Sequence, residues 1–551
     1  MGFMGVYANR LARLWRQFSV VGLLVGTLFF AFSLTPSLVP RPFLVQGLIS
    51  GLSFTAGYAV GFFGRWLWSY VELPVPGPRV DWVIKILATV ICSVVAVTFL
   101  WQAGEWQNAL RALMEMEEAG GVQPVSVGLM TLVVFVILLT LARLFKHTFR
   151  FLALWLGRYI PQHVSNVVGV LVAAALFWSV IDGVIFSLAL RAADNSYQQV
   201  DALIEDELTR PTDPLKAGSV DSYVDWRDLG RQGRNFVSSG PRASDLSEFF
   251  GENTMEPIRI YVGLNAAETA EERADLALRE LKRVNAFERS VLLLVTPTGT
   301  GWVDPAALNP MEYLHRGDIA TVTAQYSYLP SALSLMVEGE YGAEMARALF
   351  EKVYGHWSSL PADERPRLYL HGLSLGALNS DRSFDIYDVI QDPFHGALWS
   401  GPPFRSETWR KATRERDPGT SAWLPSFRDG DVVRFMNQHQ GLDRYDGEWG
   451  AFRIAYLQHA SDPITFFDPE SFYREPEWIR EPRGPDVSPD LRWYPIVTML
   501  QLAADMAAGS TPAGFGHTFA ANDYIDAWRV LTEPEGWSES DIERLRALFN
   551  D

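Results

Sequence analysis

The fold of the second half of this chain is decided by the stretch Arg367-Leu368-Tyr369-Leu370-His371-Gly372-Leu373-Ser374-Leu375-Gly376. Its apolar first half predicts a buried strand, and a G-x-S-x-G pentapeptide comes directly after it. A strand that turns sharply into a helix at such a pentapeptide forms a nucleophile elbow, in which strain lifts the serine above the sheet edge. Gly372 and Gly376 are the small residues that let strand and helix pass closely. An ordinary glycine-rich turn is the competing interpretation, and the surrounding pattern argues against it.

Alternating strands and helices surround the pentapeptide. Short apolar or β-branched runs predict strands at residues 258–262, 290–296, 319–325, 432–436 and 452–458. Helical patterns occupy residues 270–283, 494–508 and 522–531. The run at 290–296 is apolar throughout, as in parallel strands that are covered on both faces. The alternation predicts an α/β domain over residues 257–551, with a mainly parallel sheet.

A nucleophilic serine needs a base, and the base needs an orienting acid. In α/β-hydrolases these come after the elbow in the order acid, then histidine. His517 is the only histidine after Asp462, and it lies in a glycine-flanked loop. Asp462 comes after the strand predicted at 452–458, at the edge where catalytic groups gather in open α/β sheets. The sequence therefore predicts a triad of Ser374, Asp462 and His517.

Other acids and histidines compete for these roles. Asp443 and Asp468 are weaker rivals of Asp462, which is itself also compatible with a simple Asp-Pro turn. The histidines at positions 371, 395, 439 and 459 all precede Asp462 in the chain. A solvated loop histidine is the competing interpretation of His517.

An oxyanion hole requires two backbone N–H groups that face the developing negative charge. The residue after the nucleophile, Leu375, should supply one of them. The other should come from a loop after an early strand, and residues 297–302 fit because they come after the strand at 290–296. Thr298, Gly299 and Thr300 are the candidate donors, with a plain glycine turn as the alternative.

The first third of the chain predicts a membrane domain. Five stretches have the length and low charge of bilayer spans, which need about 20 apolar residues. They cover residues 17–40, 42–64, 86–104, 121–142 and 164–190. Asp182 lies inside the fifth and is either a functional acid or a capping group near its outer end. Two GxxxG pairs, Gly47/Gly51 and Gly57/Gly61, favour close helix packing within the bundle.

Basic residues set the expected orientation. Lys and Arg gather before the first span, between the second and third, and between the fourth and fifth. The opposite connections carry only Arg41 and, among acidic residues, Arg111. The positive-inside rule therefore places the N-terminus in the cytoplasm and the chain after the fifth span outside.

Composition excludes several classes of protein. The 551 residues carry a net charge of −17 and no basic stripe, which argues against nucleic-acid binding. Aromatic residues make up 13%, enough to exclude intrinsic disorder. The single cysteine, Cys92, permits neither an internal disulfide nor a cysteine metal cluster. The chain is therefore expected to consist of a transmembrane domain (1–192), a polar acidic linker packed loosely on the next domain (193–256) and a catalytic domain (257–551).

Several segments together resemble a family of bacterial membrane-anchored α/β-hydrolases with a multi-span N-terminal domain. The matching segments are Ser37-Leu38-Val39-Pro40-Arg41 with Gln46-Gly47, Pro297-Thr298-Gly299-Thr300-Gly301-Trp302, residues 325–331, the elbow, Gly401-Pro402-Pro403 and residues 458–463. The family has G-E-S-L-G at its elbow, whereas Leu373 stands here; this position is not a triad member. The resemblance implies the hydrolase fold and chemistry in a bacterial inner membrane, and it implies no substrate.

We therefore expect a membrane-anchored serine hydrolase of the esterase or lipase type, with no cofactor and no metal. Its partners would be the lipid bilayer and an acyl ester that is lipid-linked or envelope-associated. An acyltransferase would use the same triad, with an alcohol or amine in place of water. A non-catalytic scaffold on a hydrolase fold is the alternative from another class, but it has no need of all three triad residues. A transporter is least favoured, because the spans lack repeated breaks and further buried charges.

Overall fold

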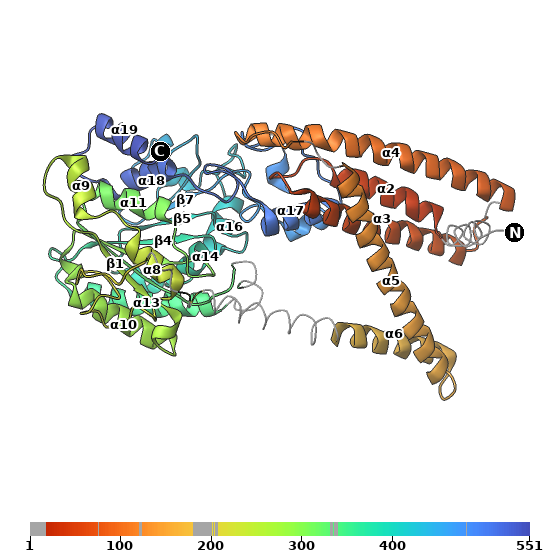
Figure 1. Cartoon of the computed structure of the whole chain (residues 1–551), viewed down its shortest axis with the longest axis horizontal. Coiled ribbons are helices and arrows are strands. Elements are labelled where there is room, and N and C mark those ends of the chain that lie inside the picture. Colours follow the sequence, from red (N-terminus) through yellow and green to blue (C-terminus); the bar gives the residue numbers. More distant parts are fainter. Residues whose placement is uncertain are drawn as a thin grey trace. The chain divides into compact units, whose positions relative to one another are not determined.

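The computed structural model describes residues 18–74, 77–120, 124–179, 201, 203, 208–330, 334, 340–480 and 482–550. The chain divides into two compact units, whose elements are labelled in Figure 1. Unit 1 comprises Met1–Leu188, Phe467–Arg480 and Pro485–Pro512. Unit 2 comprises Ala189–Phe466, Glu481–Gly484 and Ala513–Asp551. Two late segments of the sequence thus belong with the N-terminal helices.

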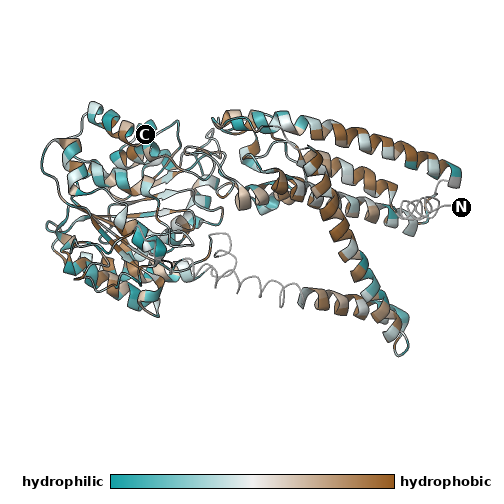
Figure 2. Cartoon of the chain, in the orientation of Figure 1, coloured by the Kyte–Doolittle hydropathy of each residue, from teal (hydrophilic) through white to brown (hydrophobic). Residues whose placement is uncertain are grey.

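Unit 1 is built from apolar helices. They are α2 (Val20–Ser33), α3 (Phe43–Tyr70), α4 (Pro78–Leu113), α5 (Pro124–Leu156) and α6 (Gln162–Trp178). Among the described residues, α3, α4 and α5 are long and apolar enough to cross a membrane. Figure 2 shows long hydrophobic stretches along these helices.

The first predicted span is shorter than expected, and the fifth is described only in part. α2 has 14 residues and ends at Ser33, because the chain leaves the helix ahead of Pro36. α6 has 17 residues, and the rest of the fifth predicted span, including Asp182, lies outside the described residues. The described residues therefore contain three helices of spanning length, and they cover the fifth predicted span only in part.

Glycines allow the helices of unit 1 to approach closely. A Cβ atom on Gly61 would lie 2.5 Å from the carbonyl oxygen of Val21 on α2. On the other side of α3, a Cβ atom on Gly51 would lie 2.6 Å from the Cβ atom of Val134 on α5. The two GxxxG pairs of α3 thus face two different helices of the same chain, as expected for packing within the bundle.

Helix α17 (Val497–Ala508) joins unit 1 through polar contacts with the end of α2. The Gln501 side-chain amide donates to the carbonyl oxygens of Ser33, at 3.3 Å, and Thr35, at 3.0 Å. Asp505 is fully buried, accepts from the Leu38 amide at 3.0 Å and forms an ion pair with Arg41. The carbonyl groups that the end of α2 leaves unsatisfied are therefore bonded by residues more than 460 positions later in the chain.

Unit 2 contains a seven-stranded sheet in the order β1-β3-β2-β4-β5-β7-β6, with every pairing parallel. The strands are β1 (Ile258–Val262), β2 (Val291–Thr296), β3 (Ile319–Ala324), β4 (Arg367–Leu373), β5 (Gly396–Ser400), β6 (Val433–Met436) and β7 (Arg453–Leu457). β2, β4 and β5 occupy the middle and are almost wholly buried. The predicted α/β fold class is confirmed.

Helices cover both faces of this sheet. Figure 1 shows α10 (Ala270–Arg283) and α13 (Tyr341–Ser359) on one side, and α11 (Pro305–Leu314) and α18 (Ala521–Thr532) on the other. Shorter helices complete the unit, including α14 (Leu375–Asp381), α16 (Glu407–Arg414) and α19 (Glu539–Leu548). Because all strands are parallel, their carboxyl ends meet at one edge of the sheet, where loops can bring catalytic residues together.

The acidic segment expected to pack loosely is closely attached to β1. It contains α8 (Gly230–Ser238) and α9 (Ala243–Phe250), and Leu229, Val237 and Leu246 are fully buried. The guanidinium group of Arg259 on β1 donates to the Phe236 carbonyl oxygen at 2.9 Å. Leu229, Val237 and Leu246 thus pack into the sheet domain, whereas Val220 and Tyr223 of the same segment are exposed at 78% and 57%.

Candidate active site

Ser374 lies in the turn between β4 and α14 with φ 59° and ψ −124°. Residues other than glycine rarely adopt a positive φ, and such strain is the mark of a nucleophile elbow. A Cβ atom on Gly372 would lie 2.3 Å from the backbone of Gly376, so both positions of the motif require glycine. The Ser374 amide donates to the carbonyl oxygen of Ser400 on β5 at 3.0 Å, which fixes the turn against the sheet.

Asp462 and His517, which are 55 residues apart, meet beside the carboxyl end of β7. The Nδ1 atom of His517 lies 2.7 Å from the Oδ2 atom of Asp462. Asp462 is fully buried, and its carboxylate also accepts from the amide of Ile464 at 2.8 Å and the hydroxyl of Thr465 at 3.0 Å. The Nε2 atom of His517 is buried and has no hydrogen-bond partner among the described residues. One ring nitrogen is thus held, and the other is left to act as a base.

Two residues that the sequence analysis did not assign to the site hold the His517 loop. The Ser461 hydroxyl accepts from the Gly516 amide at 2.9 Å. The Nδ1 atom of His459 lies 3.0 Å from the Gly516 carbonyl oxygen. Both side chains are fully buried, next to Asp462 in sequence. The segment 459–462 therefore both supplies the acid and fixes the backbone that carries the histidine.

Gly401 brings the acid–histidine pair next to the elbow. It comes directly after Ser400, whose carbonyl oxygen accepts from Ser374, and its own amide donates to Leu457 on β7 at 2.9 Å. A Cβ atom on Gly401 would lie 2.5 Å from Cε1 of His517 and 3.0 Å from Oδ2 of Asp462. Only a residue without a side chain leaves room for the pair at this edge of the sheet.

We expect Gly401→Ala to lower kcat about 100-fold, because the added methyl group displaces the imidazole ring and small displacements have effects of this size. Gly419→Ala is the matched control. Gly419 also has a positive φ, +88° against +50° for Gly401, but nothing lies within 4 Å of its Cβ position. Both variants carry backbone strain, so strain alone would affect them alike. Because only the methyl group at position 401 meets His517, only Gly401→Ala should lose activity against p-nitrophenyl butyrate. Equal losses in the two variants would contradict this geometry.

The loop at 297–302 lies against the helix that begins at the elbow. A Cβ atom on Gly376 would lie 2.2 Å from the Thr296 carbonyl oxygen. Leu375 is the first residue of α14, so its amide has no acceptor within the helix. The Thr298 amide donates to the Trp302 carbonyl oxygen at 3.0 Å and is therefore already used within the loop. Thr298 is therefore less suited to supply the second oxyanion donor.

The rival residues have other environments. Asp468 caps a 3-10 helix, η6 (Pro469–Phe472), by accepting from the Glu470 amide at 2.8 Å. Asp443 lies within another, η5 (Leu442–Arg444). His371 is buried with Nδ1 2.8 Å from the Leu398 carbonyl oxygen, and burial lowers its pKa to about 4. Burial also lowers the pKa of His395 to about 4. These two histidines stay neutral near pH 7, and each bonds to the sheet backbone: His371 to Leu398, and His395 by accepting from the Leu368 amide at 3.1 Å.

Asp304 is a buried carboxyl group within electrostatic reach of His517, and the sequence analysis did not select it. It caps α11 by accepting from the Ala306 amide at 2.9 Å. Burial raises the pKa of Asp304 from 3.8 to about 6, while the Ala306 hydrogen bond and His517 act in the opposite direction. Its only sequence signal was the Asp-Pro pair at a helix start.

Asp304→Asn should remove a loss of stability that occurs as pH rises through the pKa of Asp304. The folded pKa of Asp304 exceeds its ordinary value, so wild-type stability falls as pH rises from about 4 to about 6. The full difference corresponds to roughly 3 kcal/mol. Asparagine still caps the helix but carries no charge. Melting temperatures at pH 4 and pH 8 should show a gain for the variant at pH 8 alone, and the same change at both values would contradict the shift.

Among the described residues, no group of three or more His, Cys, Asp and Glu side chains is arranged to hold a metal ion. The arrangement at the elbow is instead suited to acyl transfer through a serine, because a strained serine, a buried acid–histidine pair and a helix N-terminus meet at one edge of the sheet.

Comparison with family models gives two matches that succeed one another along the chain. Residues 34–241 match the model described as "Alpha/beta-hydrolase family N-terminus". Residues 258–545, more than half of the chain, match the model described as "Alpha/beta-hydrolase family". Searches of curated proteins and of solved structures gave no match. The second match agrees with the all-parallel sheet and the strained serine, and the chain belongs to this α/β-hydrolase family with its distinct N-terminal region.

Proposed function

We propose that this protein is a membrane-anchored serine hydrolase that cleaves an acyl ester with Ser374, His517 and Asp462. The observation that carries the proposal is the His517–Asp462 pair, with Nδ1 bonded to a buried carboxylate at 2.7 Å and Nε2 without a partner among the described atoms. A loop histidine with a merely structural role has no need of a buried acid. A histidine held in this way has the tautomer that can take a proton at Nε2.

In this proposal, Nε2 of His517 accepts the Ser374 hydroxyl proton while Oγ attacks the carbonyl carbon of the ester. The tetrahedral oxyanion is stabilised by the Leu375 amide and by an amide of the 298–300 loop. The imidazolium, stabilised by Asp462, then gives its proton to the leaving alcohol, and an acyl-enzyme remains. Water then attacks the acyl group as His517 takes its proton, and the imidazolium returns that proton to Oγ of Ser374 as the acid leaves.

Membrane anchoring is supported by three apolar helices of spanning length in the described part of unit 1. The asymmetry of Lys and Arg favours a cytoplasmic N-terminus and an extracytoplasmic hydrolase in a bacterial inner membrane. An enzyme held at a membrane meets esters in the bilayer or envelope more often than dilute soluble esters. We therefore propose a lipid-linked or envelope-associated acyl ester as the substrate class.

The test uses the purified full-length protein in a neutral detergent and a biotin-tagged fluorophosphonate. We expect labelling of folded protein on the peptide that contains Ser374, and none after heat denaturation. A panel of p-nitrophenyl esters of increasing chain length should compete with the label. Absence of labelling, or labelling at another serine, would overturn the assignment. With glycerol present, free acid as the main product supports hydrolysis, whereas acyl-glycerol would identify an acyltransferase.

A further inference from the structure

One end of unit 1 contains a hollow of about 430 Å³, here called the Arg41 pocket. Its lining comes from the end of α2, the start of α3, the end of α4, the start of α5 and the loop after α17. The volume is within the range of small-molecule sites. It lies where the connections poor in Lys and Arg come together, the side that the charge pattern predicts to be outside.

The lining of the Arg41 pocket includes two arginines and no acidic residue. Arg41 and Arg111 are the only basic residues of their two connections, at residues 34–42 and 105–123. The Nε atom of Arg111 donates to the Glu117 carbonyl oxygen at 2.7 Å, and no carboxylate among the described residues pairs with this guanidinium group. Two arginines far apart in sequence thus converge on one hollow, which favours a negatively charged group.

One donor of the Arg41 side chain has no partner in the described part of the chain. Its side chain is only 1% exposed. Its Nε atom pairs with Asp505 and its Nη1 atom donates to Gln46 at 3.2 Å, whereas Nη2 is buried without a partner among the described atoms. A buried N–H group of a charged side chain without an acceptor is costly. An oxygen of a bound anion would remove that cost.

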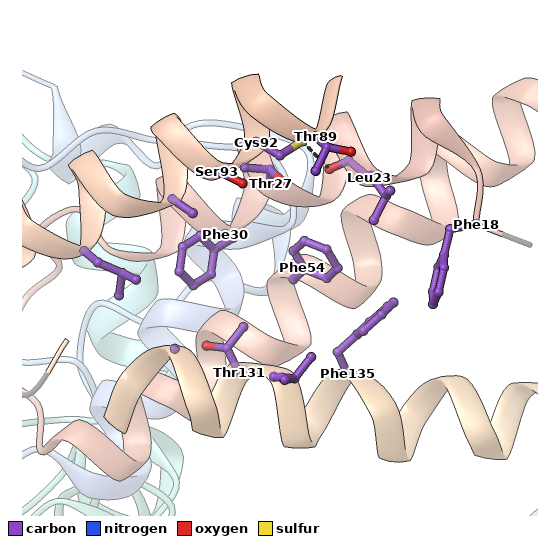
Figure 3. Close-up of a pocket in the computed structure, with 14 residues that line it drawn as sticks. Phe18, Leu23, Thr27, Phe30, Phe54, Thr89, Cys92, Ser93, Thr131 and Phe135 are labelled. Carbon is purple, nitrogen blue, oxygen red and sulfur yellow. Dashed lines mark hydrogen bonds between the residues drawn. The ribbon is translucent and has the colours of Figure 1, made fainter. Parts of the chain in front are cut away.

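A second hollow of about 450 Å³ lies farther along the helices, and its lining is almost entirely apolar (Figure 3). Figure 3 shows Phe30 and Phe54 in its middle, with Phe135 below them. Leu100 lines both hollows, so they are neighbours. A cationic pocket beside an apolar one matches the two parts of an amphiphile.

We propose that unit 1 binds an anionic acyl amphiphile, with its phosphate or carboxylate head group in the Arg41 pocket and its acyl chain in the apolar hollow. Arg41 Nη2 and Arg111 donate to the head group. The planar guanidinium groups match the oxygen atoms of an anionic head group. A zwitterionic choline lipid also carries a cation, which the two arginines repel, so it binds less well. This site is separate from Ser374 and does not require the proposed esterase activity.

The proposal is tested by native mass spectrometry of the full-length protein in a neutral detergent. The probes are palmitate, phosphatidylglycerol, phosphatidylcholine and inorganic phosphate. We expect phosphatidylglycerol or palmitate to be retained more strongly than phosphatidylcholine, and the stronger of the two identifies the head group. If inorganic phosphate bound as tightly as the lipids, the proposal that the ligand has an acyl chain would be overturned. If phosphatidylcholine were retained as strongly as the anionic lipids, the proposed role of the head group's negative charge would be overturned.

Two variants locate the site. Arg111→Gln should weaken binding of the anionic lipid about tenfold, the loss expected for one charge-assisted hydrogen bond. Ala103→Phe fills the pocket, because Ala103 is buried on its lining, and should lower retention of every lipid. Arg65→Gln, an exposed arginine that lines neither hollow, is the charge-matched control. Fluorophosphonate labelling and melting temperature confirm folding, and unchanged lipid retention in both Arg111→Gln and Ala103→Phe would overturn the location.

Discussion

Replacing Ser374 by alanine is expected to lower kcat for p-nitrophenyl butyrate by about 10⁶-fold, the loss seen when a triad nucleophile is removed. Alanine has no hydroxyl group, so no covalent intermediate can form, and the remaining groups only bind the ester and stabilise charge. The oxyanion donors survive, so a rate about 10³-fold above the uncatalysed reaction should persist. Retention of more than about 1% of the wild-type kcat would contradict the role of Ser374.

Stability measurements separate loss of the nucleophile from loss of the fold. Ser374 has a φ of 59°, a strained conformation that alanine also has to adopt but glycine accepts freely. Ser374→Ala should therefore melt near the wild-type temperature, whereas Ser374→Gly should be more stable by about 1 kcal/mol and equally inactive. Ser383→Ala is the control, since it removes another buried serine hydroxyl, one bonded to the Ser380 carbonyl oxygen at 2.8 Å. It should keep its activity.

Local patterns predicted much of unit 2. The apolar runs at β2 and β4 and the glycines around Ser374 specify strand and turn through residues next to each other in the chain. The order of acid and histidine along the chain, together with the position of Asp462 after the strand at 452–458, selected Asp462 and His517, whose side chains lie 2.7 Å apart in the structure. These features need no knowledge of distant contacts.

Contacts between distant residues account for the features that sequence patterns missed. The helical pattern of α17 was visible, but its partners on α2 lie more than 460 residues away, and periodicity carries no information about them. The sequence marked Gly401 only as part of the Gly401-Pro402-Pro403 segment, because its need for glycine comes from His517, 116 positions later. In unit 1, hydropathy located the apolar stretches but not where α2 ends, since the carbonyl oxygens of Ser33 and Thr35 are bonded by the distant Gln501.

The second large effect is expected at Asp462. Asp462→Asn should lower kcat by about 10⁴-fold with little change in KM, the loss observed when the triad histidine is held in the wrong tautomer. Asparagine can keep the bond from the Ile464 amide at one side-chain oxygen. Its amide nitrogen, however, would then face Nδ1 of His517 and donate to it, which moves the ring proton to Nε2. A protonated Nε2 cannot accept the proton of Ser374.

A matched pair of variants tests this explanation. Asp468→Asn makes the same chemical change at the rival acid, where the side chain caps a 3-10 helix and asparagine caps equally well. It should therefore leave kcat unchanged. Thr465→Val removes the 3.0 Å hydroxyl bond to the Asp462 carboxylate but keeps its charge, so we expect a loss of about tenfold. The tautomer of His517 depends on the charge of Asp462, which Thr465→Val retains. If Thr465→Val lost as much activity as Asp462→Asn, the carboxylate would therefore act through local packing and not through the tautomer.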